Sequence, residues 1–409
     1  MLASNTIHNM DCIRGMKMLP DSSVQCCVTS PPFWSLRDYG SEEQYGLEPT
    51  PEDYVAKMVE VFTEVKRLLK QNGTLWLNLG DAYWGSGKAG KNSSYQTKHT
   101  EFGKPSTNSS RFGIPTTGKH PALKSKDLIG LPWRIAFALQ GFAVVPMYSF
   151  TEWADILKEA REKGDWELVL FVEGLLRKSD LLEGLKKSGW YLRQDIIWHK
   201  PNPLPESMTD RCTKSHEYIF LLSRSPKYYF DQQAIKTVLK DSSVLRLLQD
   251  IELQRGSDRI PGKTNGTMKA KVSGRKPRPG IDINGGNQSK GHIPMGIEGT
   301  SFKGHKGNFK ANGELIGGSM ANKRSVWTVA TRPFKEAHFA TYPEELIVDC
   351  IKAGSKESDL ILDPFMGSGT TALVSLLLNR KFIGFELNPD YIRIAHKRLR
   401  ERLGIFFNN

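Results

Sequence analysis

A strand, a glycine turn and a helix are predicted near the C-terminus, over Asp363-Pro364-Phe365-Met366-Gly367-Ser368-Gly369-Thr370-Thr371. Gly367 and Gly369 allow the backbone to turn tightly and to approach a ligand without a clash from a Cβ atom. Thr370 and Thr371 stand at the N-terminus of the predicted helix, where free N–H groups and the helix dipole favour an anionic group. An acidic residue, Glu386, ends the next predicted strand, where it can accept hydrogen bonds from ribose hydroxyls. The pattern predicts a nucleoside-cofactor site.

A second chemical pattern lies near the N-terminus, in Thr29-Ser30-Pro31-Pro32-Phe33-Trp34. Two prolines after a strand make a stiff, extended loop at the rim of a sheet. We expect the proline carbonyls to stay free as hydrogen-bond acceptors, and Phe33 and Trp34 to offer aromatic faces beside them. Acceptors next to a stacking ring suit a flipped base that carries an exocyclic amine. Alone, Ser-Pro-Pro is an ordinary turn, so this interpretation depends on the cofactor site.

Both patterns follow strands in a chain that alternates strands and helices. The predicted strands cover 24–30, 74–79, 191–199, 218–222, 360–362 and 382–385, and the predicted helices cover 51–70, 128–140, 344–351, 371–378 and 389–403. We expect Asn72-Gly73 to end the first of these helices. Alternating strands and helices predict an α/β fold, with a doubly wound and mainly parallel sheet covered on both faces.

The net charge is concentrated in two segments. The 409 residues include 57 lysines and arginines against 44 acidic residues, a formal net charge of +13. Residues 255–325 hold 14 basic against 4 acidic residues, and residues 85–125 hold 7 against 1, so the remaining 297 residues carry a net charge of −3. Both segments are rich in glycine and cannot pack on their own apolar surface. We expect them to be arms that become ordered on a polyanion; surface insertions without a role are the alternative.

The composition indicates a globular protein and argues against a membrane-spanning, secreted or disulfide-rich one. A hydrophobic content of 39% and a charged content of 25% are typical of a globular chain. No apolar run of 18 residues is present to form a transmembrane helix, and the N-terminal residues do not resemble a secretory signal. The five cysteines form no CxxC pair, which argues against a disulfide framework or a zinc site and fits a reducing cytoplasm.

Together, these patterns resemble the DNA amino-methyltransferases of the permuted β class, which methylate cytosine N4 or adenine N6. The order is that of the family, with Thr29–Phe33 first and Asp363–Thr371 near the C-terminus. Two further segments match the family, Phe385-Glu386-Leu387-Asn388-Pro389 and His338-Phe339-Ala340-Thr341-Tyr342-Pro343. The resemblance covers roughly residues 7–84, 128–146, 189–240 and 326–403. It implies a seven-stranded, Rossmann-like methyltransferase sheet of permuted order that binds S-adenosylmethionine.

The resemblance also implies roles for individual residues. The catalytic set is Ser30, Pro31, Pro32 and Phe33: the Ser30 side chain and the Pro31 carbonyl accept hydrogen bonds from the target amine, and the flipped base stacks on Phe33. No metal is expected. The cofactor would be bound by Asp11, Cys12, His338, Phe339, Asp363, Phe365, Gly367, Ser368, Gly369, Thr370, Glu386 and Asn388.

A division into functional parts is implied as well. Residues 1–84 and 126–240 would form the catalytic half of the core, 326–409 the cofactor-binding half, and 241–325 the target recognition region. Residues 85–125 would be a basic loop and 147–188 a helical insertion. We expect the basic segments to contact DNA phosphates through Lys88, Lys91, Arg275, Lys276, Arg278, Lys303 and Lys306. The resemblance implies double-stranded DNA as the partner. It places the protein in the cytoplasm of a bacterium or phage host, at the nucleoid and not at a membrane. It also suggests two further partners, a second copy of the chain and a separate cognate restriction endonuclease.

Several alternatives stay open. Ser30 stands where many adenine enzymes of the family carry Asp, which favours cytosine N4, with adenine N6 by the same mechanism as the alternative. A non-catalytic DNA-binding protein would explain the charge but not the cofactor turn. A methyltransferase of RNA or protein would explain the turn, but less well the Ser-Pro-Pro-Phe loop. The absence of a Pro-Cys nucleophile in that loop argues against cytosine C5 chemistry.

Overall fold

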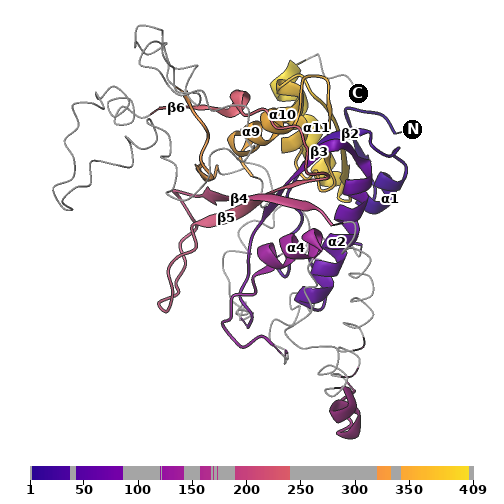
Figure 1. The fold of residues 1–409 in the computed structure, drawn as a ribbon, viewed down its shortest axis with the longest axis vertical. Helices are drawn as coiled ribbons and strands as arrows, with labels where there is room; N and C mark the ends of the chain where they lie inside the picture. The colour runs from indigo at the N-terminus through magenta and orange to yellow at the C-terminus, as the bar shows by residue number, and fades with distance from the viewer. Residues whose placement is uncertain are drawn as a thin grey trace, which may run out of the picture. The chain divides into compact units, whose positions relative to one another are not determined.

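The computed structural model describes residues 2–36, 43–85, 120, 122–141, 157–166, 169, 173, 189–239, 320–332 and 342–404 (Figure 1). The chain forms two compact units, Met1–Ala234 with Arg324–Asn409, and Ile235–Lys323. In the second unit, β6 (Thr237–Val238) and β7 (Met320–Ala321) form a short antiparallel pair. The limits of this unit lie close to those of the predicted recognition region, whose role stays a prediction.

The first unit is built on a sheet of eight strands in the order β1-β10-β9-β2-β3-β5-β4-β8. Among these strands, β5 runs antiparallel to its neighbours β3 and β4, and every other pair is parallel. The strands are β1 (Thr6–Asn9), β2 (Val24–Thr29), β3 (Leu69–Leu79), β4 (Tyr191–His199), β5 (His216–Ser223), β8 (Val326–Thr328), β9 (Leu360–Asp363) and β10 (Lys381–Glu386). The mainly parallel α/β sheet is confirmed, with one strand more than the seven expected, because the short β8 pairs with the outer edge of β4.

Helices cover both faces of this sheet (Figure 1). One group packs on one face and consists of α1 (Cys12–Lys17), α2 (Pro51–Leu68) and α4 (Leu131–Gln140). The other face carries α9 (Glu344–Gly354), α10 (Thr370–Leu377) and α11 (Pro389–Leu403). All six residues of β2 are buried, as expected for a central parallel strand that lies between two helical layers.

Local sequence explains where α2 begins, but its end differs from the prediction. The Thr50 side chain caps the helix by accepting a hydrogen bond from the Asp53 N–H at 3.1 Å, and proline occupies the first turn. The helix stops at Leu68, because Leu69 already pairs with β2 and begins β3. The expectation that Asn72-Gly73 ends this helix is therefore wrong. Gly73 lies within β3, where a Cβ atom would come within 2.9 Å of a backbone oxygen.

The predicted helical insertion is described only in part, and residues 157–162 there are helical. The elements β1, α1 and β8 were not anticipated from the sequence, since each is short. Within the described residues, no helix is both long enough and apolar enough to span a membrane.

Candidate active site

The carboxyl ends of the parallel strands meet at one edge of the sheet, and the candidate residues lie along it. At the centre of the sheet β9 and β2 are neighbours, but β9 leads through α10 to β10 on one side and β2 leads through α2 to β3 on the other. Ligands of doubly wound sheets bind where the connections reverse direction in this way. Side chains at or just beyond these strand ends are Asp11, Ser30, Asn78, Asp363 and Glu386.

The glycine turn has the geometry that its sequence predicts. Gly367 and Gly369 have φ angles of +53° and +77°, in the left-handed region that favours glycine. A Cβ atom on Gly369 would lie 2.7 Å from the Cβ of Ala395 in α11. The turn therefore needs glycine at Gly369 both for its backbone conformation and for its close packing against α11.

Glu386 ends β10 beside this turn. Its two carboxylate oxygens accept hydrogen bonds from the backbone N–H groups of Gly367 at 2.9 Å and Asn388 at 2.8 Å. Burial raises the pKa of Glu386 above its ordinary value of 4.5, although the two N–H donors act in the opposite direction. Each oxygen of an ionised carboxylate has a second lone pair, so Glu386 can also accept hydrogen bonds from hydroxyl groups.

Tyr45 joins the N-terminal candidate residues to those of the glycine turn. Its hydroxyl donates to the Asp11 carboxylate at 2.9 Å and accepts from the Cys12 thiol at 3.6 Å. Its ring meets Phe365 edge to face, with 5.3 Å between the ring centres. Burial, together with the charge of Asp11, raises the pKa of Cys12 to about 12, so this thiol is neutral. Sequence reasoning missed Tyr45, because an isolated tyrosine in a loop belongs to no periodic pattern.

Two of the predicted cofactor residues turn toward α11. The Arg398 guanidinium donates to the carbonyl and the hydroxyl oxygen of Ser368, at 2.7 and 2.9 Å, and to the hydroxyl of Thr370 at 3.1 Å. These bonds hold the turn against α11. The side chains of Ser368 and Thr370 thus support the shape of the turn, and a direct contact of either with cofactor stays a prediction.

Asp363 is the centre of a buried hydrogen-bonded network. Its carboxylate accepts from the hydroxyls of Thr29 and Thr371, each at 2.6 Å, from the N–H of Phe365 at 3.0 Å and from the Tyr342 hydroxyl at 3.2 Å. Burial raises the pKa of Asp363, against the lowering effect of these donors. The network ties the end of β2 to the end of β9, and so fixes the Ser30 loop beside the glycine turn.

Ser30 is held by a chain of polar side chains. Its hydroxyl donates to the Asn78 carbonyl oxygen at 3.0 Å. The Asn78 amide nitrogen donates to the Glu217 carboxylate at 3.1 Å and to the Tyr218 carbonyl at 3.2 Å, which fixes the orientation of the amide. Glu217 also pairs with Lys200. Because the hydroxyl proton points at Asn78, the Ser30 oxygen presents its lone pairs as acceptors. Asn78 was not predicted, since it reads as one polar position in an apolar strand.

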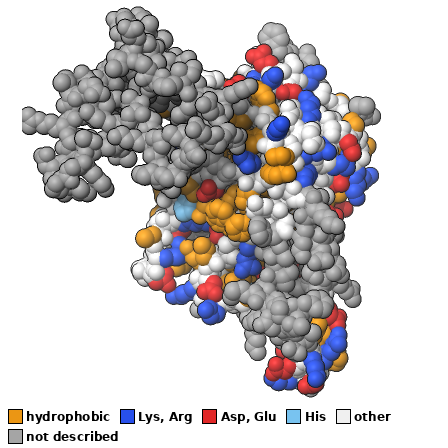
Figure 2. Space-filling view, viewed as in Figure 1, with side chains coloured by type: hydrophobic (Ala, Val, Ile, Leu, Met, Phe, Trp, Pro, Cys, Tyr) orange, Lys and Arg blue, Asp and Glu red, His pale blue; other side chains and the backbone are white. Residues whose placement is uncertain are grey.

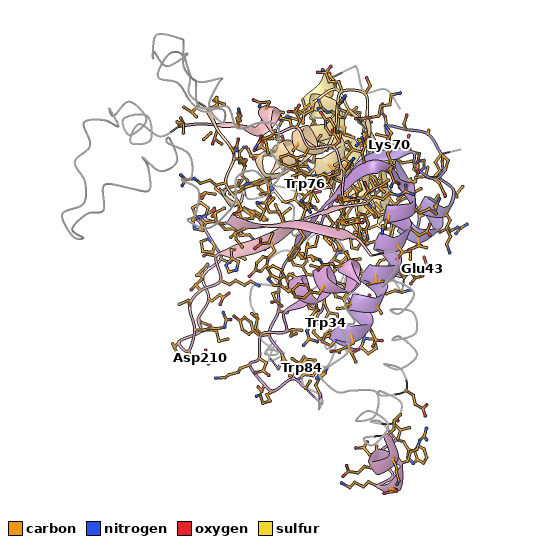
Figure 3. The ribbon with its side chains drawn as sticks, in the orientation of Figure 1. Trp34, Glu43, Lys70, Trp76, Trp84 and Asp210 are labelled. Atoms are coloured by element: carbon orange, nitrogen blue, oxygen red, sulfur yellow. The ribbon has the colours of Figure 1, made fainter. Side chains whose placement is uncertain are left out.

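The remainder of the loop corrects two expectations. The Pro32 carbonyl is not free, because it accepts a hydrogen bond from the Tyr54 hydroxyl at 2.7 Å. Trp34 offers no face to a ligand: it is 1% exposed and lies parallel to Trp84, with 6.2 Å between the rings (Figure 3). The Pro31 carbonyl accepts no hydrogen bond from the described residues, and its role as an acceptor for the target amine stays a prediction.

Phe33 is partly exposed and lies directly over Gly80, which follows β3. A Cβ atom on Gly80 would lie 2.4 Å from the ring of Phe33. The absence of a side chain at Gly80 therefore sets the position of the ring.

The other predicted site residues lie outside the described residues. They are the cofactor candidates His338 and Phe339, and the DNA-binding candidates Lys88, Lys91, Arg275, Lys276, Arg278, Lys303 and Lys306. In the part of the chain that the structure does describe, no group of three His, Cys, Asp or Glu side chains could hold a metal ion.

Comparison with known proteins decides the family. The model of the N6/N4 DNA methylase family matches residues 24–397, most of the chain. The chain belongs to this family.

Type II methyltransferase M.Cfr9I of Citrobacter freundii is 33% identical over 395 residues, which cover 97% of this chain and 87% of that protein. Type II methyltransferase M.SmaI of Serratia marcescens is 32% identical over 383 residues, which cover 93% and 86% of the two chains. Among solved structures, the cytosine-N4-specific PvuII DNA methyltransferase aligns with all of this chain and 88% of its own, at 14% identity and a TM-score of 0.48, too low to bear on the target base.

Membership confirms the enzyme class that the sequence predicts. The protein is a DNA methyltransferase of the N4-cytosine or N6-adenine type, and S-adenosylmethionine is its methyl donor. The residues at the carboxyl edge fit this donor. The Glu386 carboxylate lies beside the glycine turn, and Tyr45 contacts both Asp11 and the ring of Phe365, so carboxylates and aromatic rings of the kind that a nucleoside can bind are present together.

Proposed function

We propose that the enzyme methylates the N4 amine of cytosine within a specific sequence of duplex DNA, after the base has been flipped out of the helix. The observation that carries this proposal is the Ser30 hydroxyl, which is neutral and is held as a hydrogen-bond acceptor by the equally neutral Asn78 at 3.0 Å. A serine at this position favours cytosine over adenine in the family that the chain resembles. Methylation of adenine N6 through the same residues is the second candidate.

The exocyclic amine of a base is a weak nucleophile, because its lone pair is delocalised into the ring. S-adenosylmethionine supplies an electrophilic methyl group on its sulfonium sulfur. The Ser30 oxygen and the Pro31 carbonyl accept hydrogen bonds from the two N–H groups of the amine, which draws the nitrogen toward tetrahedral geometry. Phe33 stacks on the flipped ring and fixes its plane. Catalysis then rests on position and orientation, which can lower a barrier by roughly 7–11 kcal/mol in favourable cases.

Glu386, Asp11 and the backbone of the glycine turn are the proposed contacts to S-adenosylmethionine. The buried Asp363 network acts indirectly, because it holds the cofactor turn and the Ser30 loop together. Asn78 is a positioning residue in this proposal, since it orients the Ser30 hydroxyl without contacting the base.

We further propose the remaining functional arrangement. Residues 241–325 read the DNA sequence, and the basic segments contact phosphates. The enzyme works in the bacterial cytoplasm, and it protects DNA from a separate restriction endonuclease. A homodimer is part of the same proposal. Sedimentation of the purified protein tests the dimer, and sequencing of its host genome for an adjacent endonuclease gene tests the partner.

The base assignment is tested by digesting methylated duplex DNA to nucleosides and analysing them by mass spectrometry. We expect N4-methylcytosine from the wild type. Finding N6-methyladenine alone would overturn the assignment to cytosine. Ser30→Ala and Asn78→Leu should both lose methyl transfer and keep binding of S-adenosylmethionine, and Ser225→Ala, which removes a hydroxyl distant from this edge, serves as the control.

A further inference from the structure

We propose that the loop between β4 and β5, residues 200–215, inserts the side chain of Leu204 into duplex DNA beside the target base and fills the space that the flipped base leaves. This inference rests on the proposed base flipping. It assigns a DNA-contacting role to a loop for which the sequence analysis gave none.

The loop leaves the sheet at the same edge as the candidate active site. Because β5 is antiparallel to β3, its first residues lie beside the last residues of β3. A continuous chain of contacts runs from Lys200, the first residue of the loop, through Glu217 and Asn78 to Ser30. From the other arm of the loop, the Lys214 ammonium donates to the Asp81 carbonyl at 3.0 Å. The base of the loop is thus connected to the proposed catalytic serine.

The apolar side chains of the loop are exposed. Leu204 is 74% exposed and Met208 is 53% exposed. A single exposed apolar residue is ordinary on a protein surface. Here, two large ones lie four positions apart on one loop, with Pro201, Pro203 and Pro205 around the first. In Figure 1 the β4–β5 hairpin extends beyond the sheet, and Figure 2, in the same orientation, shows apolar side chains next to charged ones on this part of the surface.

Polar contacts hold the loop in place. The Asn202 side chain exchanges two hydrogen bonds of 2.9 Å with the backbone of Thr331. The Arg211 guanidinium lies 4.1 Å from the ring centre of Tyr83 and also pairs with Glu206. These contacts tether the long loop to neighbouring parts of the protein. A wedge that is held in this way loses little conformational freedom on binding.

The charges of the loop suit a DNA partner. Its two acidic side chains are neutralised, Glu206 by Arg211 and Asp210 by Lys126 at 2.6 Å. Asp210 lies toward the far end of the loop (Figure 3). A phosphate backbone that approaches the loop therefore meets carboxylates whose charges are already paired with Arg211 and Lys126. Proteins that unstack DNA commonly insert apolar side chains such as leucine between base steps. A base that is flipped out leaves a gap between the apolar faces of its neighbours, which an apolar side chain can fill.

The test compares two substrates for the Leu204→Ala variant. One is a duplex that carries the enzyme's own recognition sequence, found by sequencing DNA that the enzyme has methylated. The other is the same duplex with an abasic position opposite the target base, which is then already unpaired. On the paired duplex, we expect the methyl-transfer rate of the variant to fall about tenfold or more, because no side chain then fills the space that the flipped base leaves. On the unpaired duplex, we expect its rate to stay within about twofold of wild type.

Two further variants sharpen the result. Leu204→Met keeps a wedge of similar size and should retain the wild-type ratio between the substrates. Leu377→Ala is the matched control, because Leu377 is 47% exposed at the end of α10 away from the glycine turn, and it should change neither rate. An equal loss on both substrates, or no loss on either, would overturn the wedge. The methylated base is identified separately, from the product of the wild-type enzyme. If the base is adenine and not cytosine, the ratio of rates on the two substrates still tests the role of Leu204.

Discussion

Substitution of Gly80 by alanine is expected to lower the rate of methyl transfer, and to do so only by displacing the ring of Phe33. The added Cβ atom would lie 2.4, 2.8 and 3.1 Å from three carbons of the Phe33 ring, whereas ordinary contacts begin at 3.4 Å. The ring must therefore move by about 1 Å, and a misplacement of this size in a reacting complex can lower the rate by about 100-fold, or ~2.7 kcal/mol. Gly80 has no left-handed φ angle, so alanine adds no backbone strain there.

The assay is the initial rate of transfer of a tritiated methyl group to duplex DNA, with binding of S-adenosylmethionine measured by calorimetry. We expect the rate to fall and cofactor binding to stay unchanged. The control is a double-mutant cycle with Phe33→Ala, in which Gly80→Ala should have almost no further effect, because the ring that it displaces is gone. An undiminished rate, or an equal additional loss in the Phe33→Ala background, would refute the reasoning.

Three more outcomes follow from the contacts above. Tyr45→Phe removes the hydroxyl that donates to Asp11, and should weaken S-adenosylmethionine binding by about tenfold in calorimetry with less effect on the rate at saturation. Burial alone would raise the pKa of Glu52, but the hydrogen bond and charge of His120 and the charge of Arg134 outweigh it and lower the pKa below 4.5. Glu52 therefore stabilises the fold above pH 4.5 and loses this effect as the pH falls through its lowered pKa; urea unfolding should show a smaller difference between wild type and Glu52→Gln at pH 3.5 than at pH 7. Neutralising the lysines and arginines of 255–325 should weaken DNA binding and flatten its salt dependence, and an unaltered salt slope would contradict phosphate contacts there.

The sequence predicts the parts of the site that depend on backbone geometry. A strand, two glycines and a helix leave few conformations, so the positive φ angles of Gly367 and Gly369 and the place of Glu386 could be anticipated. The alternation of strands and helices predicts the parallel sheet for the same reason, because its apolar periodicity is local.

Residues that act through long-range side-chain contacts could not be predicted in this way. Asn78, Tyr45 and Arg398 each join segments that are distant in sequence, and none belongs to a local pattern. Trp34 shows the opposite failure. Its neighbours Phe33 and Ser35 are partly exposed loop residues, yet Trp34 is buried and lies parallel to Trp84, which comes from another loop 50 positions later.

The pairing of β2 with β9 has a consequence for folding of the chain during its synthesis on the ribosome. The Thr29 hydroxyl reaches the Asp363 carboxylate across 334 positions of chain, and β1 pairs with β10 across a similar span. The ribosome must therefore synthesise the chain at least as far as Asp363 before β2 gains β9 as its second neighbour. Until then, the emerging chain holds β2 with one edge unpaired, which is a surface open to aggregation and to chaperones. The proposed methyl-donor site therefore forms only after β9 and β10 have been synthesised, and methylation cannot begin before that point.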